Sequence, residues 1–197
     1  MHIRSILMAA LLLMLLPTPG RAAAGPFITM QGGGESIALT AAAIQAGEEA
    51  IIETPMGAEG PEAMLLLRRG SPNGTNLTAV LGDAGENLLG TLPQAMQGFD
   101  AHGELEEGFS LQVVVRDLNG DNTPEVLVAS GDGAAILTVA VFSYSPGADG
   151  MFRCVGVIEG QNALQIDAGG VISVPYGSQG LSTEYTVAAD GALVKRQ

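Results

Sequence analysis

The sequence predicts a mainly β protein: an antiparallel, meander- or sandwich-like single domain with one or two short helices, preceded by a signal peptide. Residues 110–194 contain short runs rich in Val, Ile, Leu and Phe, separated by turn-forming Gly, Asp, Asn and Pro. The chain has 197 residues, 47% of them apolar, which suits one domain with a real core. It has no repeat at a period of about 20 to 50 residues, so a complete solenoid or propeller is not expected.

Residues 1–24 have the three parts of a cleavable export signal. Arg4 precedes an apolar run over residues 6–16, proline and glycine then break any helix, and small alanines occupy positions 22–24. The apolar run is too short for a membrane span, which needs about 20 residues, and no later stretch is long enough. We therefore expect one periplasmic or secreted β-rich domain over residues 25–197.

The first half of this domain contains a stretch whose pattern fits both a helix and a strand. Residues 35–46 fit a helix, because Ile37, Ala41 and Ile44 lie on one helical face and the stretch is rich in alanine. Alternate residues from Ile37 to Ala43 are also apolar, as in a strand. We favour the helix.

The rest of the first half is predicted to contain short strands and one further helix. A hairpin pairs the runs 63–67 and 77–81 across the turn-forming residues 71–74, and residues 51–52 form another strand. Residues 85–96 are expected to hold a short helix that proline interrupts.

From residue 110 onward the pattern is that of an antiparallel meander. Residues 111–116 alternate in side-chain type. Turn formers cluster at 145–150, and Gly169-Gly170 and Asp190-Gly191 stand at hairpin positions. The predicted strands are 111–116, 125–129, 135–144, 152–159, 163–167, 171–174, 184–187 and 192–194.

One stretch, residues 117–125 (DLNGDNTPE), carries metal-binding chemistry. Oxygen-bearing side chains stand at loop positions 1, 3, 5 and 9: Asp117, Asn119, Asp121 and Glu125. Thr123 at position 7 can supply its backbone carbonyl. Ca²⁺ prefers about 6 to 8 oxygen ligands, and a tight loop can wrap this spacing around one ion. Gly120 and Asn122 tolerate the left-handed backbone that such a wrap requires.

The flanks of this loop are predicted strands, and position 12 is Val128 where an EF-hand needs a bidentate Glu, so the loop is not an EF-hand. The stretch VVVRDLNGDNTPEVLV instead resembles the calcium loop of the FG-GAP and VCBS-type repeats, a strand–loop–strand motif also found in integrin alpha-chain propellers. The resemblance implies these calcium ligands: the side chains of Asp117, Asn119, Asp121 and Glu125 and the carbonyl of Thr123. The chain departs from the family pattern at Asn122, where the family has Gly, and at Glu125, where Asp is usual.

The resemblance covers residues 110–145 in one copy, so it implies a local motif in a β-rich setting and not a propeller. A site with three carboxylates and one amide in an exported protein suggests weak, structural Ca²⁺ binding, with a Kd on the order of 10⁻⁴ to 10⁻³ M. The ion would pin the turn between two strands and neutralise charges that otherwise repel each other.

The chain is acidic, with a formal net charge of −13, which argues against nucleic-acid binding. Residues 100–132 hold eight acids against Arg116 alone. We interpret this acidic 100–132 region as a solvated face. Asp132 is a possible additional oxygen donor to the loop.

Catalysis is the less favoured function. Cys154 and His102 could form a nucleophilic pair, but Cys154 lies in an apolar strand, where a small buried side chain is expected, and His102 is predicted to be exposed in a loop. One Cys excludes an internal disulfide, and the one Cys and one His within residues 25–197 disfavour zinc. The sequence therefore favours an exported, non-catalytic binding or interaction domain with an unknown protein partner. The alternative is a carboxylate-dependent hydrolase that uses the acidic 100–132 region.

Overall fold

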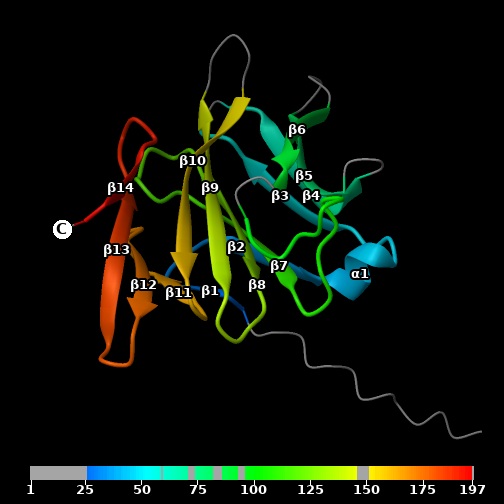
Figure 1. Cartoon of the computed structure of the whole chain (residues 1–197). Coiled ribbons are helices and arrows are strands. Elements are labelled where there is room, and N and C mark those ends of the chain that lie inside the picture. Colours follow the sequence, from blue (N-terminus) through cyan, green and yellow to red (C-terminus); the bar gives the residue numbers. More distant parts are fainter. Residues whose placement is uncertain are drawn as a thin grey trace, which may run out of the picture.

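The computed structural model describes residues 26–58, 60–70, 74–81, 86–92, 96–145 and 151–196 (Figure 1). The described chain is a single, mainly β domain with one short helix, so the predicted fold class is confirmed. The expected signal peptide over residues 1–24 lies outside the described residues. No helix in the described ranges is long and apolar enough to cross a membrane.

The strands form three sheets stacked as layers, and the middle layer is the central sheet. Its strands are antiparallel, in the order β10-β9-β8-β7-β2. They are β2 (Glu35–Thr40), β7 (Ser110–Arg116), β8 (Glu125–Gly131), β9 (Leu137–Ser145) and β10 (Met151–Gly160). The meander predicted from residue 110 onward is therefore confirmed in this layer.

Both faces of the central sheet are buried, one against each neighbouring sheet. Val113 and Val128 belong to a core shared with the first-half strands, and Val114, Leu127 and Val139 belong to a second core shared with the C-terminal strands. Double burial explains why β7, β8 and β9 are almost continuously apolar. The side-chain alternation of residues 111–116 is present, but neither set faces solvent.

The C-terminal sheet packs on one face of the central sheet. Its order is β1-β11-β12-β13-β14, and all pairs are antiparallel except β1 with β11. The strands are β1 (Ile28–Met30), β11 (Leu164–Ile166), β12 (Ile172–Tyr176), β13 (Leu181–Val187) and β14 (Leu193–Lys195). The last four confirm the predicted meander, whereas β1 is a strand that the sequence analysis did not predict.

The N-terminal sheet packs on the other face, in the order β3-β4-β5-β6. The strands are β3 (Ala50–Pro55), β4 (Glu62–Gly70), β5 (Gly74–Leu81) and β6 (Glu86–Thr91). The predicted hairpin is confirmed, since Leu67 is paired with Leu77. The helix predicted within 85–96 is wrong, because residues 86–91 instead pair with β5 and satisfy the backbone groups on its second edge.

Residues 35–46 form a strand followed by a short helix, so each of the two predicted structures is present in part of the stretch. Residues Glu35–Thr40 pair with β7 along their whole length, so the favoured helix is wrong for this part. Helix α1 (Ala41–Gln45) then begins after Thr40, whose hydroxyl accepts a hydrogen bond from the N–H of Ala43 at 3.2 Å. The long-range pairing with β7 outweighs the local helical preference of the alanine-rich sequence.

The expected burial of Cys154 is also wrong. Cys154 is exposed, with its sulfur 3.6 Å from the carbonyl oxygen of Gly156. It lies on β10, an edge strand of the central sheet, at a bulge where the pairing with β9 shifts between Cys154 and Gly156. The bulge and the edge position leave this part of an apolar run open to solvent.

Candidate metal centre and adjoining cleft

The loop 117–125 connects β7 to β8 at one end of the central sheet. Two of its residues have a left-handed backbone, Gly120 with a φ of 81° and Asn122 with a φ of 66°. Asn122 is the one non-glycine residue with positive φ in the part of the chain that the structure describes. The predicted conformational role of these two positions is therefore confirmed.

The first three predicted ligands hold the loop backbone with their side-chain oxygens. Asp117 accepts hydrogen bonds from the N–H groups of Gly120 at 2.7 Å and Asn122 at 2.9 Å, one on each carboxylate oxygen. Asn119 Oδ1 accepts from the N–H of Asp121 at 2.9 Å, and Asp121 Oδ1 accepts from that of Thr123 at 2.7 Å. A carboxylate oxygen has two lone pairs, so each of these Asp oxygens keeps acceptor capacity.

Glu125, the fourth predicted side-chain ligand, is buried at the base of the loop with only 1% of its surface exposed. Its Oε2 accepts a hydrogen bond from the N–H of Leu118 at 2.9 Å. Burial, with a smaller effect from the negative charges of Asp121 and Asp117, raises the pKa of Glu125 to about 7 despite the opposing effect of the Leu118 hydrogen bond. The site therefore holds an excess of negative charge around a desolvated carboxyl.

The side-chain nitrogen of Asn119 lies among three oxygens from separate parts of the chain. Asn119 Nδ2 is 3.0 Å from Asp121 Oδ2, 3.4 Å from the Ala188 carbonyl oxygen and 3.5 Å from Glu125 Oε1. The three oxygens surround the partial positive charge of an amide N–H. They are hard oxygen donors of the kind that Ca²⁺ prefers. The donor set therefore fits Ca²⁺ in its chemistry.

As the side chains stand, no three His, Cys, Asp or Glu residues in the described ranges are close enough together to hold a metal ion. The predicted ligands nevertheless lie in one loop, and the carboxylates of Asp121 and Glu125 both accept from the Asn119 amide. Their carboxylates are occupied by N–H donors from the loop itself.

The loop contacts turns from both outer sheets. In the C-terminal sheet, Ala188 accepts from Asn119, and Gly170 lies so close to Leu118 that an added Cβ would collide with the Leu118 carbonyl. In the N-terminal sheet, a Cβ on Gly57 would be 3.3 Å from the Thr123 hydroxyl. The loop therefore stands where the three layers meet, and sequence reasoning did not find these partners because they are distant along the chain.

Arg116, the last residue of β7, fixes the start of the loop. Its side chain is 8% exposed and donates to the carbonyl of Gln31 at 2.8 Å and to that of Asp167 at 2.7 Å. These carbonyls belong to the segments that follow β1 and β11. The arginine thus joins the central sheet to the C-terminal sheet directly before the loop.

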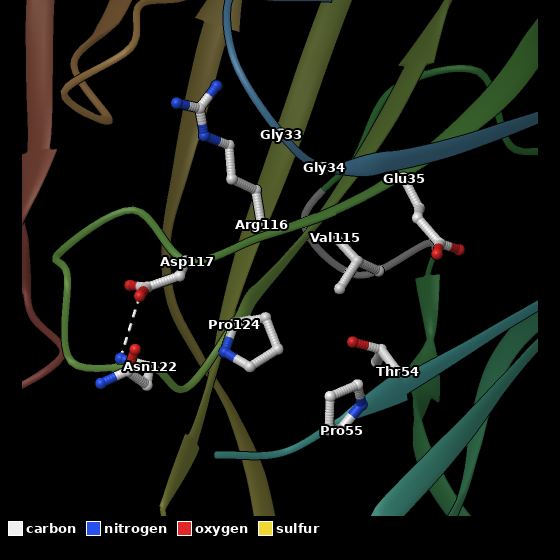
Figure 2. A pocket seen from close by; sticks show the side chains of 10 residues that line it. All are labelled: Gly33, Gly34, Glu35, Thr54, Pro55, Val115, Arg116, Asp117, Asn122 and Pro124. Carbon is white, nitrogen blue, oxygen red and sulfur yellow. Dashed lines mark hydrogen bonds between the residues drawn. The ribbon is translucent and has the colours of Figure 1, made fainter. Parts of the chain in front are cut away.

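A cleft of about 630 Å³ adjoins the loop, between the start of β2, the end of β3 and the end of β7. Figure 2 shows Asp117 and Asn122 on the loop side and Thr54 and Pro55 on the opposite side, with the guanidinium of Arg116 directed away from them. Val115, Pro55 and Pro124 give the cleft an apolar part. A cleft of this volume has the size of a small-molecule or peptide subsite.

The acids of region 100–132 do not form one face. Asp117, Asp121 and Glu125 lie where β7 ends and β8 begins, whereas Asp132 follows the far end of β8. Seven strand residues separate the two ends by roughly 20 Å. Asp132 cannot therefore add an oxygen to the loop, and its Oδ1 instead accepts from the N–H groups of Ala134, Ala135 and Ile136.

The remaining acids of this region precede β7, at the same end as Asp132. Asp100 accepts from the N–H groups of His102 and Glu104, which lowers its pKa, and Glu104 is paired with Arg69 at 3.0 Å. His102 is exposed, as predicted.

No family model matches this chain, and comparisons with curated proteins and with solved structures find no similar protein.

Proposed function

We propose that the protein is an exported, non-catalytic binding or interaction domain in which the loop 117–125 holds a structural Ca²⁺. The proposed ligands are the side chains of Asp117, Asn119, Asp121 and Glu125 and the carbonyl of Thr123. The resemblance of residues 113–128 to an FG-GAP or VCBS-type calcium loop supports this assignment. The predicted export signal over residues 1–24 supports the compartment.

The observation that carries the proposal is the set of oxygens around the Asn119 amide. A buried glutamate, a neighbouring aspartate and a backbone carbonyl face the same point, and only a weak N–H dipole lies among them. A cation that took the place of this N–H group, with Asn119 presenting its Oδ1 instead, would offset the mutual repulsion of Asp117, Asp121 and Glu125 and the cost of burying the ionised Glu125. The residues would supply only oxygen ligands, which suits Ca²⁺ better than zinc.

The place of the loop gives such an ion a structural role. Leu118, Asn119 and Thr123 lie against turns of the two outer sheets, so fixing the loop also fixes the end at which the layers meet. The same loop forms one wall of the 630 Å³ cleft (Figure 2). We assign this cleft as the recognition edge that the ion stiffens.

Thermal unfolding of residues 25–197 tests the metal site. The melting temperature is measured in EDTA, then with millimolar Ca²⁺ or Mg²⁺. At 10 mM, an ion with the expected Kd is present at about 10 to 100 times that Kd, which adds about 1.4 to 2.7 kcal/mol, a shift of several degrees for a domain of this size. The expected result is a rise with Ca²⁺ that Mg²⁺ does not reproduce and that is lost in the Asp117→Ala/Asp121→Ala double variant.

Asp132→Ala is the matched control, because Asp132 also holds a turn of the central sheet through backbone N–H groups but lies at the opposite end. It should lower the melting temperature equally with and without Ca²⁺. A Ca²⁺ shift that is absent from the natural protein, or that survives in the double variant, would overturn the assignment of the loop.

Export is tested separately by expressing the full chain and determining the amino terminus of the product. The expected product is extracytoplasmic and begins at Gly25. A product that stays in the cytoplasm with Met1 intact would contradict the proposed compartment and leave the metal experiment unaffected.

A further inference from the structure

The hairpin of β12 and β13 bears a second pocket, separate from the loop and its cleft. Ile172 and Val174 on β12 are buried against the central sheet, and Tyr176 lies on the same face two positions further on. Tyr176 is 48% exposed, and Leu181, its partner on β13, is 49% exposed. The inward face of the hairpin is therefore exposed toward its tip, and Figure 1 shows this hairpin at the lower left.

The pocket lies between this uncovered face and the end of β10, and its volume is about 280 Å³. The two walls approach closely, because a Cβ on Gly160 would be 3.1 Å from Val174 Cγ1. Tyr176 and the half-buried Tyr185 provide aromatic surface, and Glu159, Gln161 and Thr183 provide polar groups. The small volume limits the occupant to a fragment below the usual size of a drug-like ligand.

This combination of groups selects the chemistry of the ligand. An exposed aromatic ring can stack on a flat aliphatic C–H face. The Glu159 carboxylate accepts hydrogen bonds, and the Gln161 amide and the Thr183 hydroxyl both donate and accept. A sugar ring has such an apolar face and a rim of hydroxyls that need both donors and acceptors.

The charge of the pocket excludes acidic sugars. Glu159 is the charged residue that lines it, and no Lys or Arg does, within the described part of the chain. A carboxylate or phosphate on the ligand would meet a like charge without a compensating cation. A proline-rich peptide is a weaker fit, since such segments need several exposed aromatic ridges, and Tyr176 is the strongly exposed ring here.

We propose that this pocket, lined by Tyr176, Tyr185, Glu159, Gln161 and Thr183, binds a neutral sugar residue. The site goes beyond the proposed calcium-stiffened cleft and does not depend on it, because the two share no lining residue. Tyr176 stacks on the ring, and the polar side chains bind its hydroxyls.

The test is titration of residues 25–197 with neutral oligosaccharides, followed by tyrosine fluorescence and by saturation-transfer NMR. The chain has three Tyr and no Trp, so the fluorescence change reports on few sites. The probes are trisaccharides of glucose, galactose, mannose and N-acetylglucosamine. The expected result is saturable binding of at least one of them, in EDTA and in Ca²⁺ alike.

Three variants decide whether binding occurs at this pocket. Tyr176→Ala should weaken binding roughly tenfold or more, whereas Tyr176→Phe keeps the ring and should bind within about threefold of the natural protein. Leu181→Ala is the matched control: Leu181 is equally exposed and cross-strand to Tyr176 but does not line the pocket, so binding should be retained. Circular dichroism confirms that each variant is folded.

Three results would overturn the proposal: saturation by none of the trisaccharides, binding that Tyr176→Ala leaves unchanged, or saturable binding of a polyproline peptide in place of the sugars. Loss of the Ca²⁺-dependent melting shift would not affect the outcome. Failure of the sugar site and failure of the calcium site are therefore distinguishable.

Discussion

The side-chain amide of Gln112 pairs with the backbone of Ile28 as a neighbouring strand would. Gln112 Oε1 accepts from the Ile28 N–H at 2.8 Å, and Gln112 Nε2 donates to the Ile28 carbonyl at 3.2 Å. Nε2 also donates to the Ser36 hydroxyl at 2.8 Å. A buried side chain of the central sheet thereby satisfies both backbone groups of a residue in the C-terminal sheet and fixes the relative position of the two layers.

Replacing Gln112 by Leu should destabilise the protein by about 2 to 4 kcal/mol, because the buried N–H and C=O of Ile28 lose their partners together. Urea unfolding measures this change. Ser36→Ala removes only one hydrogen bond of the same amide and should cost about 1 kcal/mol. Equal stability of the two variants would show that the pairing with Ile28 contributes little.

Glu125 should make the metal-free protein less stable as the pH rises. Its pKa is about 7 in the folded protein against an ordinary value of 4.5, so the folded state binds its proton more tightly. The resulting stabilisation is complete below pH 4.5 and is lost as the pH rises through about 7, a change of about 3 kcal/mol.

The measurement is the free energy of unfolding in EDTA between about pH 4 and 8, for the natural protein and for Glu125→Gln, which does not titrate at this position. The difference between the two should shift in favour of the variant as the pH rises. A difference that stays constant across this range would show that Glu125 titrates normally.

Gly170→Ala should be markedly more destabilising than Gly177→Ala. Both glycines have positive φ, 80° and 64°, so each substitution has the same left-handed backbone cost of roughly 1 to 2 kcal/mol. Only at Gly170 does the new Cβ collide with backbone, at Leu118, whereas at Gly177 it meets nothing within 4 Å. The collision should add roughly 1 to 3 kcal/mol. Chemical denaturation compares them, and equal losses would mean that the turn and the loop are not in close contact.

Cys154 should react with a thiol reagent in the native protein, because it is exposed on an edge strand. The reaction of one equivalent of thiol is followed by absorbance without denaturant, and Cys154→Ser serves as the blank. A thiol that reacts only after unfolding would show that Cys154 is buried, as the sequence predicted.

The strands after residue 110 were predictable because short apolar runs there alternate with clear turn formers. The burial of the polar residues within these strands was not predictable. Gln112 and Arg116 interrupt β7 as solvent-facing residues would, yet they are 2% and 8% exposed, because a second sheet covers that face. Local sequence carries no sign of a covering layer formed by residues far away.

In the loop 117–125, too, the local conformation was predictable and the contacts with distant residues were not. Its turn chemistry was readable, since Asn122 adopts the left-handed backbone that Asn tolerates best among non-glycine residues. The contact between Asn119 and the Ala188 carbonyl was not predictable, because every residue has a backbone carbonyl and the residue type does not show which one makes a contact. Similarly, residues 86–91 look helical in isolation, and only the open edge of β5 makes them a strand.

The parallel pairing of β1 with β11 sets the order in which the chain can reach its final form. Within the runs β3 to β6, β7 to β10 and β11 to β14, each strand pairs with the strand that precedes or follows it along the chain. Thr29, by contrast, bonds to Leu164, 135 residues later. At a synthesis rate of about 5 to 20 residues per second, β1 is made on the order of 10 s before β11. Strand β1 can therefore be enclosed only after β11 has been made.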